Sequence, residues 1–423
     1  MNYIKYIKMA MAGCFVAVCL GLIYRLQLPY IFVLAVAGSF VSYKIKGQWV
    51  QKKEYDRNFF ECSDYMQQMM YSYEKSKEVQ LALQESSELF PAGKMKDALD
   101  DALAYLDMTY TGNSKRTALH IIEEQYPSPF MGLLHNYMLD AEEIGGEVGE
   151  AMDILKEEHQ RWNMRTLLYR EQCRGQQRNI LAAILAAMVL CVSMLYLIPN
   201  GNMLTKYPLY QMGTTFVCVV FMVLGWFCIK LTGRNWIEEK QSYSDEEMEK
   251  KLLKYLNQEQ KFGRGTLRKI LKKEITRTFP QWILKLSLRL QHQDVVGAIE
   301  DSKHDAPVVL NYYVSKLAEE IHDNPGQAKP FLDFLEEFKS TESVTAMKML
   351  YAIASGGAGN EGGQLMHLLQ RIQVMEDQSA KITHENAVAW MYALFLTPML
   401  LASVKLMLDM SMLLVSFMAG MKL

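Results

Sequence analysis

The fold of this chain is set by the stretch from Asn179 to Gly233, which reads NILAAILAAMVLCVSMLYLIPNGNMLTKYPLYQMGTTFVCVVFMVLGWFCIKLTG. Its two apolar runs, Ile180–Ile198 and Met212–Ile229, contain no charged residue. Each is long enough to cross ~30 Å of hydrocarbon as a helix rising ~1.5 Å per residue. The short segment Pro199–Gln211 joins them, so the stretch predicts a transmembrane hairpin. Because a hairpin returns the chain to the side it left, the polar segments on its two sides must face one compartment.

A second pair of apolar runs, Met9–Tyr24 and Leu28–Tyr43, lies near the N-terminus. Lysines before an apolar run are also typical of a signal peptide. However, the second run follows closely and no small-residue cleavage site separates the two, so we expect a hairpin with a tight turn at Arg25–Pro29. Basic residues lie on both sides of this hairpin: Lys5, Lys8, Lys44, Lys46, Lys52, Lys53 and Arg57. The positive-inside rule then places the N-terminus and the segment after Tyr43 in the cytoplasm.

The two polar blocks, residues 44–178 and 234–385, have the pattern of helical bundles with almost no strand pattern. Apolar residues recur at three- and four-residue spacing, as in Ala98, Leu99, Ala102, Leu103 and Leu106. Turn residues predict helix breaks at Phe90–Gly93, Thr111–Ser114 and Tyr126–Pro129, and then at Phe279–Pro280, Asp305–Pro307, Asn324–Gly326 and Ser355–Gly363.

The last apolar region, Asn386–Gly420, is longer than one span requires, because a straight helix of that length would measure ~52 Å. It contains Lys405 and Asp409, which share a helix face. Two accounts compete: one kinked span ends near Lys405 and a second apolar piece lies along or re-enters the bilayer, or two short spans meet there. Polar residues at membrane depth are functional candidates, whereas an interfacial turn or a structural ion pair explains the same two residues without a function.

The sequence thus predicts an all-α fold, a polytopic α-helical membrane protein with two cytoplasmic helical bundles. The expected parts are an N-terminal transmembrane hairpin, a first bundle, a central hairpin, a second bundle and a C-terminal transmembrane region, over residues 1–43, 44–178, 179–233, 234–385 and 386–423. At least five spans are predicted, and the sixth is left open.

Three arginines, Arg170, Arg174 and Arg178, stand at four-residue steps just before the central hairpin. This spacing puts them on one helix face. They are interpreted either as a contact with an acidic partner or lipid headgroups, or as an ordinary basic anchor on the cytoplasmic side.

The sequence contains no motif for catalysis, metal or cofactor binding. There is no GxxxxGK[ST], HExxH or GxSxG, and the glycine-rich Gly356–Gly359 follows no strand. Asp97, Asp100, Asp101 and Asp107 fit a solvated helix face better than a cation site. Seven scattered cysteines exclude a disulfide framework, and a net charge of −2 gives no reason to expect nucleic-acid binding. We therefore expect a protein that is not an enzyme and has no cofactor.

A similar glycine phrase precedes each of the last two membrane regions. The first contains Gly145 and Gly146 within Glu142–Met152, and the second contains Gly362 and Gly363 within Gly359–Leu369. Each pair is expected to break one helix and begin a long one, because glycine accepts backbone angles that other residues resist. This repeat is a hypothesis of shared architecture between the two halves.

With these features the chain resembles the F-domain family of type II secretion, the inner-membrane platform proteins also found in type IV and Tad/Flp pilus machines. The most similar phrase is Ala141–Met152 followed by Leu155, and the extra N-terminal hairpin resembles the Tad-type members. Gln364 departs from the pattern, since an acidic residue is more usual there.

The resemblance implies a non-enzymatic assembly platform in the bacterial inner membrane. Its expected partners are a hexameric secretion ATPase, a pilin or pseudopilin, a second platform paralogue or another copy of itself, and the lipid bilayer. The alternative is a membrane transporter or channel that uses Lys405 and Asp409.

Overall fold

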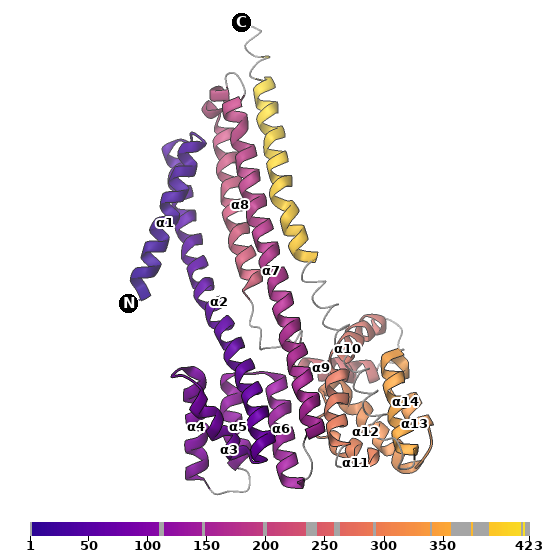
Figure 1. The fold of residues 1–423 in the computed structure, drawn as a ribbon. Coiled ribbons are helices and arrows are strands. Elements are labelled where there is room, and N and C mark those ends of the chain that lie inside the picture. Colours follow the sequence, from indigo (N-terminus) through magenta and orange to yellow (C-terminus); the bar gives the residue numbers. More distant parts are fainter. Residues whose placement is uncertain are drawn as a thin grey trace. The chain divides into compact units, whose positions relative to one another are not determined.

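A computed structural model confirms that the fold is all-α in the part of the chain that it describes. Every regular element there is a helix (Figure 1). The structure describes residues 2–109, 114–145, 149–197, 201–233, 243–257, 263–290, 293–338, 341–356, 374, 389–415 and 418.

The chain divides into two compact units, and each is assembled from separate parts of the sequence. The first contains Met1–Glu61, Trp162–Ile237 and His384–Leu423, and the second contains Cys62–Arg161 and Glu238–Thr383. The first unit therefore gathers all the apolar runs, and the second gathers most of both polar blocks.

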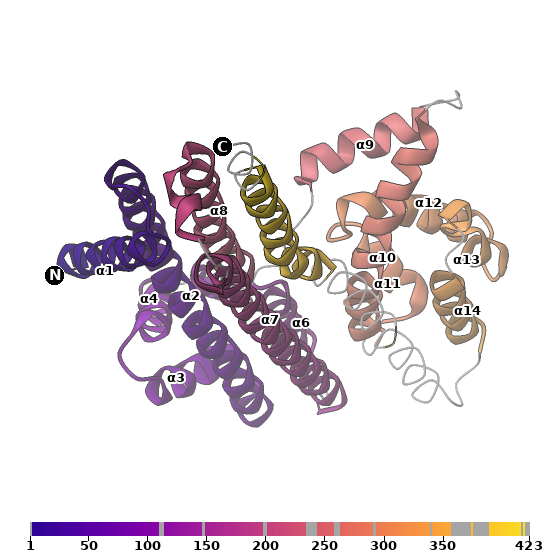
Figure 2. The same ribbon diagram turned by 90° about the horizontal axis from the view of Figure 1, so that it is seen from above.

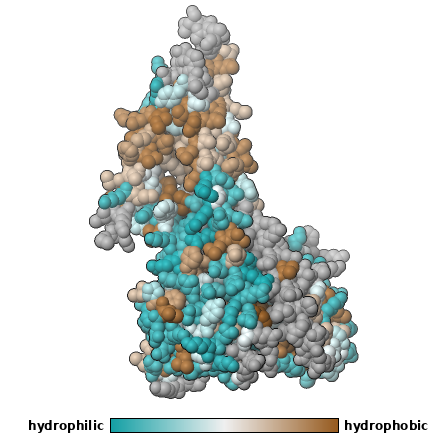
Figure 3. Space-filling model, in the orientation of Figure 1, coloured by the Kyte–Doolittle hydropathy of each residue, from teal (hydrophilic) through white to brown (hydrophobic). Residues whose placement is uncertain are grey.

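The first unit contains the helices that are long and apolar enough to cross a membrane. Five such helices lie in the described residues: α1 (Asn2–Ile23), α2 (Leu28–Ser76), α7 (Gly149–Leu197), α8 (Pro208–Thr232) and a C-terminal helix, Ala389–Val415. Large apolar side chains on these helices are exposed, among them Phe15, Phe32, Val189, Phe216 and Leu400. Figure 3 shows hydrophobic residues gathered over this unit. An apolar surface of this extent is typical of a protein in contact with lipid.

Small residues allow α1 and α2 to pack closely. A Cβ atom added to Gly13 would lie 2.6 Å from the Gly38 carbonyl oxygen, and one added to Gly38 would lie 2.8 Å from Ala17 Cβ. Gly13, Ala17 and Gly21 recur at four-residue steps, a spacing that lets helix backbones approach in lipid. The expected N-terminal hairpin therefore has a specific interface, and its turn contains Arg25 at a positive φ of 52°.

Two of the predicted segment boundaries fall inside uninterrupted helices. α2 and α7 are both 49 residues long, and each contributes residues to both units. The changes from apolar to polar sequence near Tyr43 and Arg178 therefore mark a change of surroundings along one helix and no break in the backbone.

The C-terminal helix is also uninterrupted over residues 389–415, so the backbone does not turn near Lys405. Pro398 lies within it. Figures 1 and 2 show this helix, in yellow, beside α7 and α8.

The first bundle is a closed ring of four helices, α3 (Val79–Leu89), α4 (Lys94–Met108), α5 (Ser114–Gln125) and α6 (Pro129–Ile144). Each contacts the next, and α3 also contacts α6. The predicted breaks at Phe90–Gly93 and Tyr126–Pro129 separate these helices. Ser128 caps α6 by accepting a hydrogen bond from the Met131 N–H, and Pro129 occupies its first turn.

The second bundle repeats this ring. α11 (Val295–Ser302), α12 (Val308–Asp323), α13 (Lys329–Asp333) and α14 (Thr341–Ser355) contact one another in the same cyclic order, including α11 with α14 (Figure 2). A short 3₁₀ helix, η2 (Glu336–Phe338), follows α13. α9 (Asp245–Asn257) and α10 (Arg264–Arg289) pack on this ring, with Trp282 and Ile283 deep in the core.

The predicted break at Phe279–Pro280 is wrong, because Pro280 lies inside α10. A proline in a helix removes one backbone hydrogen bond. Here Pro280 is buried among Phe279 and Trp282 of the core, so packing offsets the loss. The breaks at Asp305–Pro307 and Asn324–Gly326 do separate helices.

Candidate functional site

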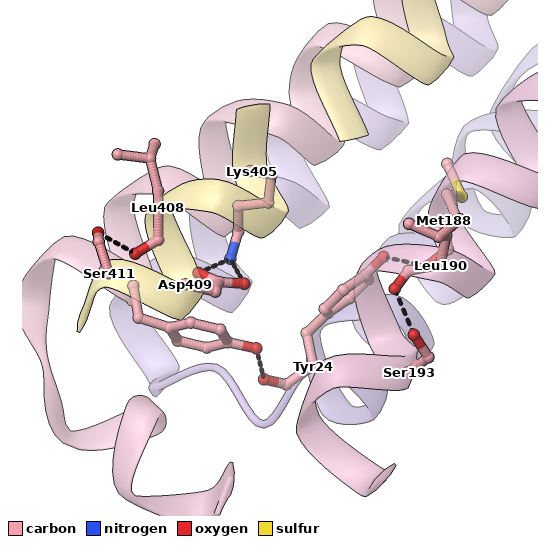
Figure 4. Close-up of polar contacts among 9 residues, drawn as sticks. Tyr24, Met188, Leu190, Ser193, Lys405, Leu408, Asp409 and Ser411 are labelled. Carbon is pink, nitrogen blue, oxygen red and sulfur yellow. Dashed lines mark hydrogen bonds and ion pairs between the residues drawn. The ribbon is translucent and has the colours of Figure 1, made fainter. Parts of the chain in front are cut away.

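Lys405 and Asp409 form an ion pair inside the first unit. Both lie on the C-terminal helix, and Lys405 Nζ donates to both carboxylate oxygens of Asp409 (Figure 4). Only 3% of the lysine side chain and none of the aspartate side chain is exposed. The two charges therefore neutralise each other within one helix, at the i,i+4 spacing that brings side chains together.

An aromatic residue of another helix covers the lysine of this pair. Lys405 Nζ lies 4.3 Å from the centroid of the Tyr210 ring on α8, a cation–π contact. The Tyr210 hydroxyl donates to the Tyr24 carbonyl oxygen at 3.2 Å, and the Tyr24 hydroxyl donates to the Met188 carbonyl oxygen of α7 at 2.9 Å (Figure 4). The ion pair is thus linked to the end of α1, to α7 and to α8.

Gln211 joins the two turns of the first unit. Its Oε1 accepts from the Gln27 N–H at 3.0 Å, and its Nε2 donates to the Thr205 carbonyl oxygen at 2.7 Å. Thr205 belongs to the 3₁₀ helix η1 (Gly201–Lys206), and Gln27 belongs to the α1–α2 turn. Sequence reasoning missed the role of this residue, because a glutamine at the edge of a loop has no distinctive pattern.

This arrangement favours a structural role for Lys405 and Asp409. A transport site needs polar groups that are free to meet an ion or a substrate. Here each charge is satisfied by the other, and the ring of Tyr210 covers the ammonium group. Through the contact of Lys405 with Tyr210, the pair joins the C-terminal helix to α8.

The three arginines before the central hairpin have different surroundings. Arg170 is buried, with an Nη atom 2.5 Å from the Asp56 carboxylate and its guanidinium 5.2 Å from the Phe60 ring centroid. Arg174 is half exposed and lies 3.6 Å from the same carboxylate. Arg178 is exposed. The surface expected for a partner or lipid contact is therefore formed by Arg174 and Arg178.

Of the four glycines predicted to form turns, the structure describes only Gly145. It has φ of 74° and ψ of 174°, a region open essentially to glycine, and its N–H donates to the Ala141 carbonyl oxygen at the end of α6. Gly146, Gly362 and Gly363 lie outside the described residues. A glycine also follows α14, and the Gly356 N–H donates to the Ala352 carbonyl oxygen.

The aspartates of α4 lie on its exposed side. Asp97, Asp101 and Asp107 are exposed, and Asp100 accepts a hydrogen bond from the Ser87 hydroxyl. Among the described residues, no group of three metal-ligating side chains comes together.

Two buried histidines of the first bundle make contacts that the sequence did not predict. His135 of α6 lies between the Tyr65 hydroxyl, 2.9 Å from Nε2, and the Glu123 carboxylate, 2.7 Å from Nδ1. His159 lies 3.1 Å from the Ser63 hydroxyl oxygen, and its burial lowers its pKa to about 4. Tyr65 and His135 are almost fully buried. These groups therefore join helices and do not form an accessible catalytic site.

Comparison of the chain with protein-family models, with curated proteins and with solved structures found no match.

Proposed function

We propose that this protein is an integral membrane protein that acts as an assembly platform, similar to those of type II secretion and of Tad or type IV pilus machines. In this proposal the five apolar helices span the bacterial inner membrane and both bundles lie in the cytoplasm. The exposed apolar side chains of the first unit and the basic residues beside its helices support this placement.

The observation that carries the proposal is the duplication of the helical ring. Both bundles contain a ring of four helices with the same cyclic order of contact, and a glycine follows the last helix of each ring. A chain with two such bundles, each preceding an apolar helix, has the tandem architecture that the family resemblance implies.

The long helices suggest how such a platform would work. α2 and α7 are each one continuous helix with residues in both units, so they would link the bundles to the membrane part of the platform. Nucleotide hydrolysis would come from a hexameric secretion ATPase bound to the bundles. A pilin or pseudopilin would contact the apolar helices, together with a platform paralogue or a second copy of this chain.

The test is co-purification in detergent with the secretion ATPase encoded by the same genome. We expect the tagged full-length protein to retain that ATPase and a variant with several exposed bundle charges reversed to retain less. A folded, monodisperse protein that never retains the ATPase under varied salt and nucleotide conditions would contradict the proposal.

A further inference from the structure

The exposed face of α7 changes from apolar to basic within about one turn. Leu181, Leu185 and Val189 are exposed at four-residue steps, and Arg178 and Arg174 continue the same stripe toward the start of the helix. Residues at these spacings share one helix face. The two arginines therefore lie directly beside the exposed apolar stripe of Leu181, Leu185 and Val189.

Three helices meet beside this stripe. Gln177 of α7 accepts hydrogen bonds on its Oε1 from Lys52 Nζ of α2, at 3.3 Å, and from the Thr232 hydroxyl of α8, at 3.2 Å. The position of Lys52 is thus fixed next to α7. Trp49 lies one turn earlier on α2 and is exposed, as is typical of an aromatic residue at the level of lipid headgroups.

Positive charge exceeds negative charge at this junction. Asp56 is shared by Arg170 and Arg174, and Glu171 lies one turn from Arg174. Against these two carboxylates stand four cations, Lys52, Arg170, Arg174 and Arg178. Arg178 has no ion pair in the part of the chain that the structure describes, and the buried Nε of Arg170 has no hydrogen-bond partner there.

We propose that this junction of α2, α7 and α8 binds the phosphate group of an anionic phospholipid, with Arg174 and Arg178 as the main contacts and Lys52 beside them. Guanidinium groups bind phosphate oxygens in pairs of parallel hydrogen bonds. The acyl chains would lie along Leu181, Leu185 and Val189, and this continuity favours a lipid over an acidic protein. The inference rests on the proposed membrane insertion.

The experiment measures lipid retention by native mass spectrometry after extraction from nanodiscs of equal parts phosphatidylglycerol and phosphatidylcholine. We expect the unmodified protein to retain phosphatidylglycerol preferentially. The variant R174Q/R178Q should bind this lipid roughly 30-fold more weakly, because two basic residues near a membrane surface usually contribute that much to the binding free energy. The matched control is K269Q/K272Q, which removes the same charge from exposed positions of α10.

The single variant R178Q leaves the Arg174–Asp56 contact in place, so it still tests the proposal if loss of that contact disturbs folding. It should also weaken binding of phosphatidylglycerol. Equal retention of both lipids by the unmodified protein would overturn the proposal, as would an equal loss in the control variant. Displacement of the lipid by millimolar inorganic phosphate would overturn the assignment to a lipid. The measurement uses only protein and lipid, so failure to bind an ATPase would leave it unaffected.

Discussion

His159 illustrates how one buried side chain makes stability depend on pH. It lies in the polar part of α7, well before the apolar run that begins at Ile180, and its burial favours the neutral ring. An unfolded histidine has a pKa near 6.5. The unfolded chain therefore binds more protons than the folded chain between that value and about 4, and stability falls as the pH falls through this window.

We predict that lowering the pH from 7 to 4 removes roughly 3 kcal/mol of stability through this residue. The measurement is the free energy of unfolding of the detergent-solubilised protein at a series of pH values. In His159→Gln this part of the pH dependence should disappear while the contribution of the carboxylates remains. A profile unchanged by that substitution would show that His159 does not control the acid response.

For the ion pair in the C-terminal helix, we predict opposite changes in stability when one partner is removed and when both are replaced. Removing one partner, as in Lys405→Met, leaves an uncompensated buried charge and should cost about 3–5 kcal/mol, whereas replacing a buried pair by apolar residues is often neutral or stabilising. The double variant K405M/D409L should therefore be more stable than either single variant. Thermal unfolding in detergent measures all three.

The same variants distinguish a structural role from a transport role. If the double variant is stable and still supports assembly of the machine, the pair has no part in moving an ion. A stable double variant that abolishes function would restore the transporter or channel alternative.

At the level of elements, the α1–α2 interface depends on the absence of side chains. Gly38→Leu would place atoms where the Gly13 carbonyl oxygen and Ala17 now lie, and should separate the two helices. The test uses cysteines at Tyr6 and Tyr43, whose ring centroids are 5.4 Å apart, joined by a short bis-maleimide. We expect efficient cross-linking in the parent and its loss in Gly38→Leu.

Gly225→Leu is the control for this experiment. It makes the same substitution in an apolar helix, α8, at a position where an added Cβ meets nothing within 4 Å. Cross-linking that survives in Gly38→Leu, or fails equally in both variants, would contradict the close packing of α1 and α2.

Local residue types predicted helix ends well where the backbone itself must turn. Pro91, Ser128 and Gly326 each lie in a gap between helices, because turns and caps depend on the residues within them. Pro280 does not break its helix, because core packing offsets the free-energy cost of the lost backbone hydrogen bond. A local sequence pattern carries no information about that packing. The helices continue through the changes at Tyr43 and Arg178, because helix periodicity is the same in apolar and polar surroundings.

The candidate sites likewise include residues that local spacing predicts and residues that it does not. Lys405 and Asp409 were found from spacing alone, because four residues along a helix bring two side chains together. The contacts of Gln211 with Gln27, of His135 with Tyr65 and of Arg170 with Asp56 join residues far apart in the chain. Only the packing of the helices against one another reveals such contacts.

For the whole molecule, the decisive prediction is the side of the membrane on which each part lies. Starting from an N-terminus in the cytoplasm, five spans place both bundles inside and place Lys206 and Met418 outside. The test introduces single cysteines at Lys206, Met418 and Glu88, all exposed, in a variant that lacks the seven natural cysteines. A maleimide that cannot cross membranes is then added to intact cells.

We expect labelling at positions 206 and 418 in intact cells, and at position 88 only after the membrane is permeabilised. Protection of position 418 would indicate an even number of spans, because the helix containing Lys405 and Asp409 would then not cross. Labelling of position 88 from outside would place the first bundle away from any source of ATP. A platform driven by a cytoplasmic ATPase would then be impossible, since the surface it must bind would face the wrong compartment.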